Sequence, residues 1–247
     1  MTILTNEAQK RKIRESGRIL SEIFEYLKKE IKEGVSTSFI DKEVERIIRE
    51  NGGEPAFKGY KGYPSTICAS VNEVVVHGIP SERIILNEGD IVGIDMGVKK
   101  NGYYADAART YFVGRISDRA RRLVEVTRQC LAAGVSQAIA GNRVSDISNA
   151  IQTAASSEGL KEVRSFVGHG IGKALHEPPE VPNWGEKGKG PVLKDGLVLA
   201  IEPMINLGSR EVKVLPDGWT AVTADSELSA HFEDTIIVGT DKAEIIT

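Results

Sequence analysis

The chain has 247 residues, of which 40% are hydrophobic and 27% are charged, the proportions of an ordinary globular protein. Its 32 Lys and Arg against 35 Asp and Glu give a net charge of −3, which argues against a nucleic-acid-binding surface as the main function. The first 20 residues are dense in charge, no apolar run approaches the length of a membrane span, and there are only two cysteines. We therefore expect a reduced, cytoplasmic protein with no secretory signal and no membrane segment.

Two helix signals begin the chain and two more follow in its second half. Apolar residues recur at helical spacing over 12–31 and 35–49, which predicts two amphipathic helices. The Gly-, Pro- and Tyr-rich stretch 53–65 is expected to be a loop. The later helices are predicted at 120–139 and 144–157, and the strand-like segments outside the region 91–113 are 66–76, 163–167, 192–205, 219–223 and 231–238.

The stretch 91–109 places two carboxylates beside a turn signal. Asn101-Gly102 between two strand-like runs is the strongest short-range hairpin signal. With those two residues as the loop, Asp95 faces Ala108, and Asp106 lies on the same face of the sheet as Asp95. Like charges this close in a half-buried site need a compensating cation. The sequence therefore predicts a metal ion at this hairpin.

The chain repeats itself with a shift of 107 residues, which carries Asp95 onto Glu202. The shift aligns ILNEGDIVGID at 85–95 with VLKDGLVLAIE at 192–202, and it also aligns the glycines and apolar residues of the two helix segments that precede them. A shift that holds over both helix and strand predicts two similar halves, about 1–118 and 119–247, around a pseudo-twofold axis. We expect a single domain of 1–247, because each half alone would leave a sheet edge open.

Four carboxylates in apolar, strand-like contexts are candidate metal ligands. Each one alone could equally be a hydrogen-bonded structural residue, but four at related places in a repeat favour a shared site that holds two divalent ions. His169 in VGHGIG is the best histidine candidate, because its flanking glycines allow close approach. This set without thiolate suits Mn, Fe, Co or Zn and predicts metal-assisted hydrolysis. The four carboxylates are Asp95, Asp106, Glu202 and Glu233.

Common motifs of other enzyme classes are absent. The chain contains no GxGxxG, HExxH, GxxxxGK or GxSxG motif. Their absence removes the usual dinucleotide-binding, zinc-protease, phosphate-loop and serine-hydrolase interpretations.

Over nearly its whole length the chain resembles methionine aminopeptidases of the short bacterial kind. The segments that carry the resemblance are KGYKGYPSTICASVNEVVVHGIP, IDMGVKKNGYYADAART, VGHGIGKALHEPP, LAIEPM and DGWTAVTADSELSAHFEDT. The resemblance implies the α+β pita-bread fold around a central site with two metals. It also implies removal of the N-terminal methionine from nascent proteins and peptides, with a preference for a small second residue. A water activated by the two metals would attack the first peptide carbonyl. The expected enzyme is a monomer that works on nascent N-termini at the ribosome.

The resemblance also implies a role for each site residue. Asp106 and Glu233 would bridge two metals, which Asp95, His169 and Glu202 would also hold. His77 and His176 would contact the substrate and steady the tetrahedral intermediate, and Glu202 would handle the proton of the attacking water. The expected walls of the methionine pocket are Phe57, Tyr60, Tyr63, Cys68, Leu175 and Trp219, and a possible monovalent-cation site contains Asn72 and Ser229.

Three positions depart from the pattern of relatives. Phe57 stands where some relatives have Cys, and Leu175 stands where some have Phe. We infer that these two side chains share one wall whose total volume is kept. His231 stands where many relatives have Gln, and it shares a strand face with Glu233. His231 is expected either to support a ligand or to be a sixth protein ligand.

Two other functions compete with this hypothesis. A proline-specific peptidase would have the same fold and ligand set, but such enzymes usually carry an additional N-terminal domain, and the helix signals here start at residue 12. A non-catalytic binding protein on this fold would lose metal ligands, whereas all five are present.

Overall fold

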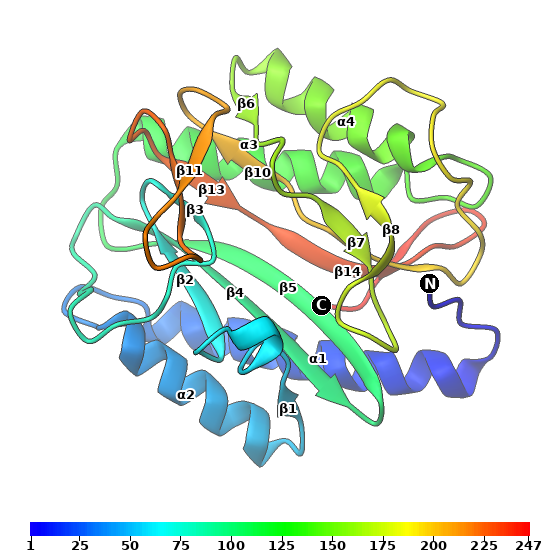
Figure 1. Ribbon diagram of the computed structural model, residues 1–247, viewed down its shortest axis with the longest axis horizontal. Coiled ribbons are helices and arrows are strands. Elements are labelled where there is room, and N and C mark those ends of the chain that lie inside the picture. The colour runs from blue at the N-terminus through cyan, green and yellow to red at the C-terminus, as the bar shows by residue number, and fades with distance from the viewer.

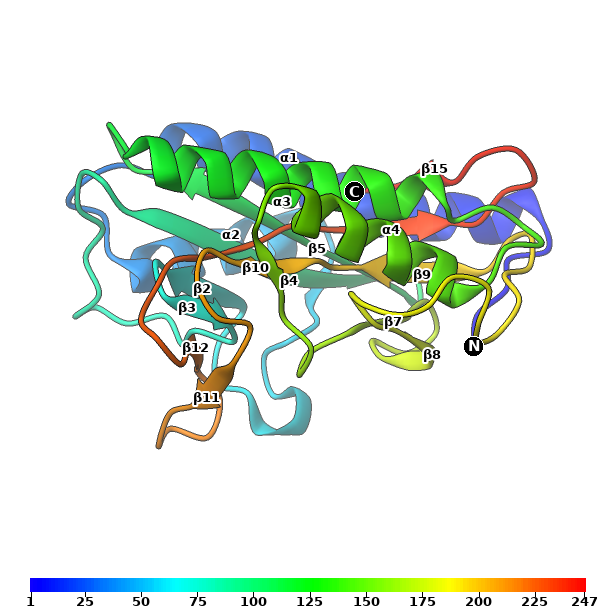
Figure 2. The same ribbon diagram turned by 90° about the horizontal axis from the view of Figure 1, so that it is seen from above.

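The computed structural model describes residues 1–247 as one nine-stranded antiparallel sheet with two small sheets and four helices. Helices α1, α3 and α4 lie along one face of the large sheet, while β7, β8, β11 and the η1 turn project from the opposite face (Figures 1 and 2). This is the predicted α+β class. The helices are α1 (Glu7–Glu30), α2 (Thr37–Glu50), α3 (Asp118–Ser136) and α4 (Val144–Ser157), with the short 3-10 turn η1 (Tyr60–Gly62).

The large sheet runs through both halves of the chain. Its order is β1-β4-β5-β14-β9-β7-β8, with β2 on β4 and β15 on β14. Two three-stranded sheets, β13-β10-β6 and β11-β12-β3, lie beside it. The strands are β1 (Glu54–Pro55), β2 (Ile67–Val71), β3 (Val74–Val76), β4 (Ile91–Lys100), β5 (Tyr103–Phe112), β6 (Lys161–Glu162), β7 (Gly168–Gly170), β8 (Glu177–Val181), β9 (Val198–Ile201), β10 (Met204–Asn206), β11 (Val212–Val214), β12 (Ala221–Thr223), β13 (Ser229–His231), β14 (Glu233–Ile237) and β15 (Glu244–Ile245).

The predicted 107-residue shift is visible in the elements themselves. Helices α2 and α4 both have 14 residues and begin at Thr37 and Val144, and strands β4 and β9 begin at Ile91 and Val198. The Gly34 N–H donates to the Leu86 carbonyl at 2.9 Å, and the equivalent Gly141 N–H donates to Leu193 at 3.0 Å. The two halves therefore share one local design, in which a glycine before the second helix bonds to the segment before the carboxylate strand.

Side-chain caps decide where the helices begin. The Asn6 side chain accepts the Gln9 N–H at 3.0 Å, so α1 begins at Glu7, five residues earlier than the apolar spacing predicted. Ser36 caps α2 in the same way through the Phe39 N–H at 3.1 Å. Caps of this kind satisfy N–H groups that have no partner inside the helix. No helix combines the length and the apolar character that crossing a membrane requires.

Three strand predictions are wrong in their extent. The run 66–76 is broken at Asn72, which has a positive φ of 53°, so β2 and β3 join different sheets. The run 192–205 divides into β9 and β10 around Glu202-Pro203, where proline cannot donate to a ladder. Residues 163–167 form no strand, because this segment crosses from β6 in a small sheet to β7 in the large one.

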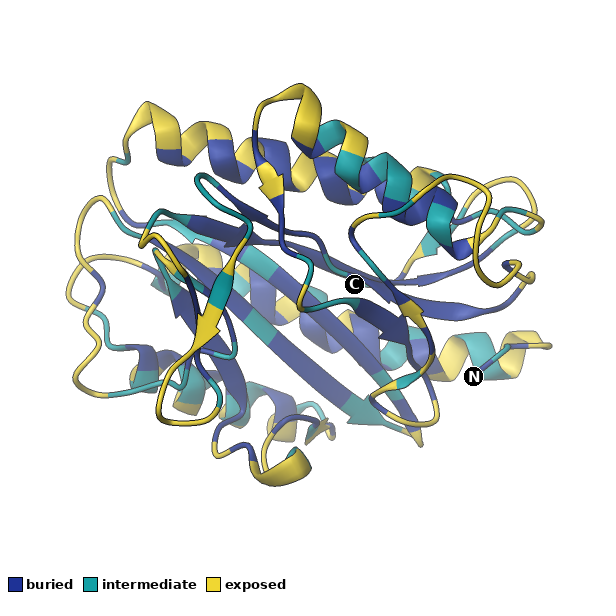
Figure 3. Ribbon diagram, turned by 45° about the horizontal axis from the view of Figure 1, so that its top comes forward, coloured by how far each residue is buried: buried dark blue, intermediate teal, exposed yellow.

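The core lies between the helices and the large sheet. Strands β4, β5 and β14 are buried along most of their length, while the helices expose only their outward faces (Figure 3). Buried side chains from both faces fix the position of these strands, because interiors pack as densely as organic crystals. The carboxylates on the central strands are therefore held on a rigid support.

Candidate active site

The β4–β5 hairpin has the predicted register. Asp95 pairs with Ala108 and Asp106 pairs with Gly97, so the two carboxylates leave adjacent strands on one face. Asn101 and Gly102 both have positive φ, at 51° and 77°, as a two-residue hairpin loop of this type requires. A single local turn thus places two acidic groups beside each other.

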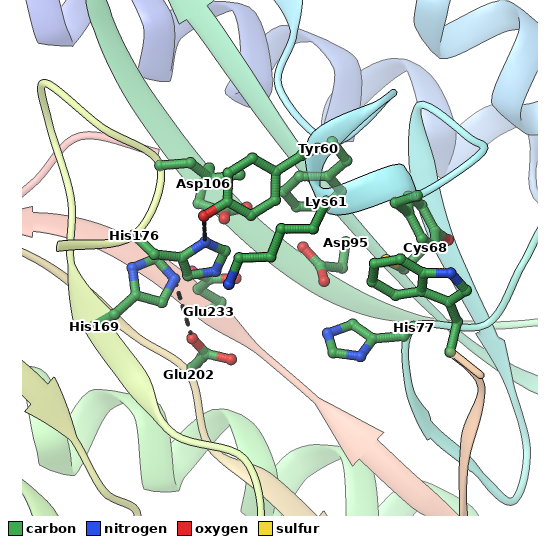
Figure 4. A pocket seen from close by; sticks show the side chains of 14 residues that line it. Tyr60, Lys61, Cys68, His77, Asp95, Asp106, His169, His176, Glu202 and Glu233 are labelled. Atoms are coloured by element: carbon green, nitrogen blue, oxygen red, sulfur yellow. Dashed lines mark hydrogen bonds and ion pairs between the residues drawn. The ribbon is translucent and has the colours of Figure 1, made fainter. Parts of the chain in front are cut away.

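The second half brings three more ligand candidates to the same place. His169 lies on β7, Glu202 follows β9, and Glu233 begins β14. One ligand atom each from Asp106, His169 and Glu233 lies within 4.8 Å of the others, and His169 Nε2 is 3.5 Å from Glu202 Oε1. Figure 4 shows these side chains, together with Asp95, converging on one pocket.

The electrostatics of this cluster fit bound cations. Three of its buried oxygens, Asp95 Oδ1, Asp106 Oδ1 and Glu233 Oε1, have no hydrogen-bond partner. Desolvation raises the pKa of Asp106 to about 7. Desolvation and the neighbouring carboxylates raise the pKa values of Asp95, Glu202 and Glu233. Buried anions without partners are costly, and divalent metals remove that cost while taking carboxylate and imidazole ligands.

His169 is oriented as a metal ligand should be. Its Nδ1 lies 2.9 Å from the Gly170 carbonyl, which can only accept, so Nδ1 carries the proton. Burial lowers the pKa of His169 to about 4, so the ring is neutral and the lone pair is on Nε2, the atom that faces Glu202. An Nδ1–H that donates to a backbone carbonyl is the usual support for an Nε2 ligand.

The pocket contains nearly all of the residues predicted from the sequence. Its cavity measures about 200 Å³. Lys61 is the one lining residue that sequence reasoning missed, although the GYKGY segment that contains it was marked by its two tyrosines. The fourteen lining residues are Phe57, Tyr60, Lys61, Tyr63, Cys68, His77, Asp95, Asp106, His169, Leu175, His176, Glu202, Trp219 and Glu233.

Aromatic residues build the side of the pocket away from the carboxylates. The Tyr63 ring lies edge-on to Trp219 with centroids 5.1 Å apart, and its hydroxyl donates to the carbonyls of Ile67 and Gly78. His77 packs edge-on against Phe166 and Trp219, and burial lowers its pKa. These contacts give the pocket a fixed apolar wall next to a charged floor.

Three predicted residues lie outside the pocket lining. His231 is buried, and its unpartnered Nε2 lies 3.9 Å from Glu202 Oε2, whereas His169 Nε2 lies 3.5 Å from the other oxygen of this carboxylate, Oε1. Asn72 and Ser229 meet through their backbones, where the Ser229 N–H donates to the Asn72 carbonyl at 2.9 Å. His231 therefore contacts the cluster through Glu202, whereas Asn72 and Ser229 form a separate contact between the β2–β3 turn and β13.

Comparison with known proteins identifies the family of the chain. The model of metallopeptidase family M24 matches residues 11–240. The chain belongs to this family. It is 48% identical over 247 residues to the methionine aminopeptidase of Clostridium perfringens strain 13, covering 100% of this chain and 99% of that protein. It is 52% identical over 235 residues to methionine aminopeptidase 1 of Bacillus subtilis strain 168, with 95% and 94% covered.

Solved structures confirm the predicted pita-bread fold. The methionine aminopeptidase of Thermotoga maritima superimposes with a TM-score of 0.97 at 41% identity, covering 100% of this chain and 99% of that one. A prolidase from Pyrococcus furiosus has a TM-score of 0.80 at 23% identity, and this chain covers 65% of its length. The second likeness concerns the fold alone. The resemblance to methionine aminopeptidases and the prediction of a metallopeptidase are confirmed.

Proposed function

We propose that this metallopeptidase removes the N-terminal methionine from nascent proteins and peptides and prefers a small second residue. The observation that carries the proposal is the junction of two surfaces in one pocket: a carboxylate and histidine cluster at the floor, and an apolar wall beside it. The cavity of about 200 Å³ is smaller than the roughly 300–1,000 Å³ of pockets for drug-sized ligands, which favours a single side chain as the occupant.

The cluster is proposed to hold two divalent ions. Asp106 and Glu233 would bridge them, and Asp95, His169 and Glu202 would complete the set, so that four carboxylate charges balance two dications. The unpartnered oxygens and the neutral, correctly oriented His169 support this assignment. Bound metal ions of this kind supply a nucleophilic water at neutral pH and polarise a carbonyl.

Other side chains are proposed to manage protons and charge. Glu202, whose Oε1 lies 3.5 Å from His169 Nε2 in the cluster, would take the proton of the attacking water as a general base. His176 and His77 face the pocket, and each would donate a hydrogen bond to the substrate as negative charge develops. The identities of the metals are left open between Mn, Fe, Co and Zn.

The walls are proposed to recognise methionine. Phe57, Tyr63, Cys68, Leu175 and Trp219 line the pocket beside the cluster, and a thioether side chain makes favourable contacts with aromatic rings. Tyr60 lies at the mouth next to His176. A small second residue would let the peptide leave the pocket without a clash at this mouth.

The cellular setting belongs to the same proposal. The chain would act as a monomer in the cytoplasm on nascent N-termini at the ribosome, without nucleic-acid or membrane binding of its own. The sheet that crosses both halves supports a single domain over 1–247. A monovalent cation near Asn72 and Ser229 would stabilise the contact between the β2–β3 turn and β13, a role supported by the backbone hydrogen bond between these two residues.

One assay tests the proposal against both rivals. Protein reconstituted with Mn or Co is given Met-Ala peptides, the matched Leu-Ala peptides and X-Pro peptides. We expect release of methionine from the Met-Ala peptides and no cleavage of the Leu-Ala or X-Pro peptides. Cleavage of X-Pro peptides with no release of methionine would make the protein a proline-specific peptidase. Absence of both activities in protein that contains no bound metal would make it a binding protein.

A further inference from the structure

Two histidines that line the pocket lie side by side but have different partners. The rings of His169 and His176 have centroids 4.2 Å apart. His169 Nδ1 lies 2.9 Å from the Gly170 carbonyl, whereas His176 Nδ1 lies 2.9 Å from the Tyr60 hydroxyl (Figure 4). A carbonyl can only accept a hydrogen bond, whereas a phenol can also donate one. Nδ1 of His169 therefore faces an acceptor, whereas Nδ1 of His176 faces a group that can donate.

The direction of the Tyr60–His176 hydrogen bond follows from the groups involved. His176 Nδ1 is the single hydrogen-bond partner of the Tyr60 hydroxyl within the protein. A phenol oxygen shares its lone pair with the ring, so it is a better donor than acceptor, while a neutral imidazole nitrogen is a good acceptor. A neutral imidazole carries one proton, on either Nδ1 or Nε2. With Tyr60 donating to Nδ1, that proton lies on Nε2.

Both partners are held by their own segments before they meet. The Tyr60 turn is closed by the Gly59 N–H, which donates to the Tyr63 carbonyl at 2.8 Å, and Lys61 within it has a positive φ of 49°. On the other side, Glu177 Oε1 accepts the N–H groups of Lys173 and Ala174 at 2.8 Å, which shapes the segment before His176. The contact is therefore between two preorganised loops from different halves of the chain.

We propose that Tyr60 is a positioning residue that holds His176 as the Nε2–H tautomer, so that His176 can donate into the pocket. The proposal rests on the proposed function, in which His176 stabilises developing negative charge. The opposite tautomer would turn a bare Nε2 toward that charge and repel it. Tyr60 would thus act on catalysis through its hydroxyl, while its ring remains part of the pocket mouth.

The direct test is the tautomer itself. Nitrogen-15 NMR of zinc-loaded protein with labelled histidine reports which ring nitrogen is protonated, and His176→Ala assigns the signal. We expect the Nε2–H form in the wild type and a mixed or Nδ1–H population in Tyr60→Phe, which keeps the ring and loses the hydroxyl. An Nδ1–H signal in the wild type, or an unchanged Nε2–H signal in Tyr60→Phe, would overturn the proposal.

Kinetics give an independent test on Met-Ala peptides. Tyr60→Phe should lower kcat about tenfold, the effect of one hydrogen bond, and leave KM within about twofold. In the His176→Ala background the same change should have no further effect, because its target is gone. Tyr26→Phe is the matched control, since the Tyr26 hydroxyl bonds to Glu43 between α1 and α2 and should leave kcat unchanged.

The outcomes separate this proposal from the proposed function. An equal loss from Tyr60→Phe with and without His176, or a change in KM alone, would contradict the positioning role. A wild type that releases no methionine would contradict the proposed function, while the NMR result would still decide the tautomer.

Discussion

The two halves of the molecule reach the same site by different routes. In the first half, β4 turns at Asn101-Gly102 directly into β5, so Asp95 and Asp106 come from one uninterrupted hairpin. In the second half, β9 ends at Ile201, and its partner β14 returns only at Glu233. The residues between them form β10, β11, β12 and β13 and supply Trp219 to the pocket wall.

This difference separates two tasks. The shared 107-residue frame supplies one carboxylate in each half, Asp95 and Glu202, four residues after the first residue of β4 and of β9. The carboxylates on the returning strands, Asp106 and Glu233, are 127 residues apart (233 − 106). The second half therefore contains an additional segment that the first half lacks. We infer that the repeat positions one carboxylate of the charged floor in each half, and that segments outside the repeat supply the remaining ligand candidates and the recognition surface. The following experiments act on one half, on the other, or on the contact between them.

The largest effect should come from removing one bridging carboxylate of either half. Asp106→Ala and Glu233→Ala would each remove one of the two proposed bridging carboxylates, so turnover of Met-Ala peptides should nearly disappear in both variants, with loss of bound metal. Kinetics and metal analysis of the two variants are the measurement. Wild-type kcat with two metals still bound in either variant would remove that half from the metal site.

A smaller effect is expected at His176, which the second half contributes. His176→Ala should lower kcat by about 10²–10³, the typical effect of losing a donor to transition-state charge. Bound metal should stay at the wild-type level, because His176 is not among the proposed ligands. If KM rose while kcat stayed constant, His176 would be a binding residue instead.

The pocket wall tests the contact between halves at a still smaller scale. Phe57 from the first half and Leu175 from the second both line the cavity. Phe57→Cys should weaken discrimination of Met from Leu by about 1–3 kcal/mol, and adding Leu175→Phe should restore much of it. The measurement is kcat/KM for Met and Leu peptides across the four-member cycle. Strictly additive effects would show that the two side chains do not share a wall.

The carboxylate cluster at the floor of the pocket should also affect the stability of metal-free protein. Folding raises the pKa of Asp106 to about 7, so the native state binds this proton more tightly than the unfolded chain does. The contribution of Asp106 to the free energy of unfolding should therefore be lost as the pH rises through about 7. It should grow as the pH falls below 7, toward about 1.4 kcal/mol per pH unit for each proton taken up by the native state. Below pH 6.5 neutral buried histidines such as His231 oppose this trend, because folding lowers their pKa.

Urea unfolding at pH 6, 7, 8 and 9 measures the effect. Asp106→Asn is the matched variant and should reduce the slope, and saturating metal should abolish it. Stability that increased from pH 7 to pH 9 would contradict the raised pKa values of the cluster.

Sequence reasoning succeeded where the determinants are local or repeated. The register of β4 and β5 follows from Asn101-Gly102 alone, and the frame of α2, α4, β4 and β9 follows from the 107-residue shift. Sequence reasoning failed where contacts outside the local pattern determine the extent of an element. The run 163–167 is apolar enough for a strand, yet it passes between two sheets. The start of α1 depends on one cap, Asn6, outside the apolar pattern.

The site shows the same division. Asp95, Asp106, Glu202 and Glu233 could be chosen from their strand contexts and the repeat. The 3.5 Å approach of His169 to Glu202 depends on the pairing of β7 with β9, which no local pattern specifies. Lys61 was missed because it reaches the pocket only when the 59–62 turn meets the loop that precedes β8. Long-range packing, which the sequence does not express locally, accounts for both gaps.

The central claim is that both halves together hold two metal ions on one floor. Metal analysis of protein purified without oxygen and then titrated with Mn or Co tests it most directly, with activity measured at each point. We expect two ions per chain in the wild type, with activity rising as they bind, and fewer than two in both Asp106→Ala and Glu233→Ala. A wild type that binds no divalent ion, or a variant of either half that still binds two, would contradict the account.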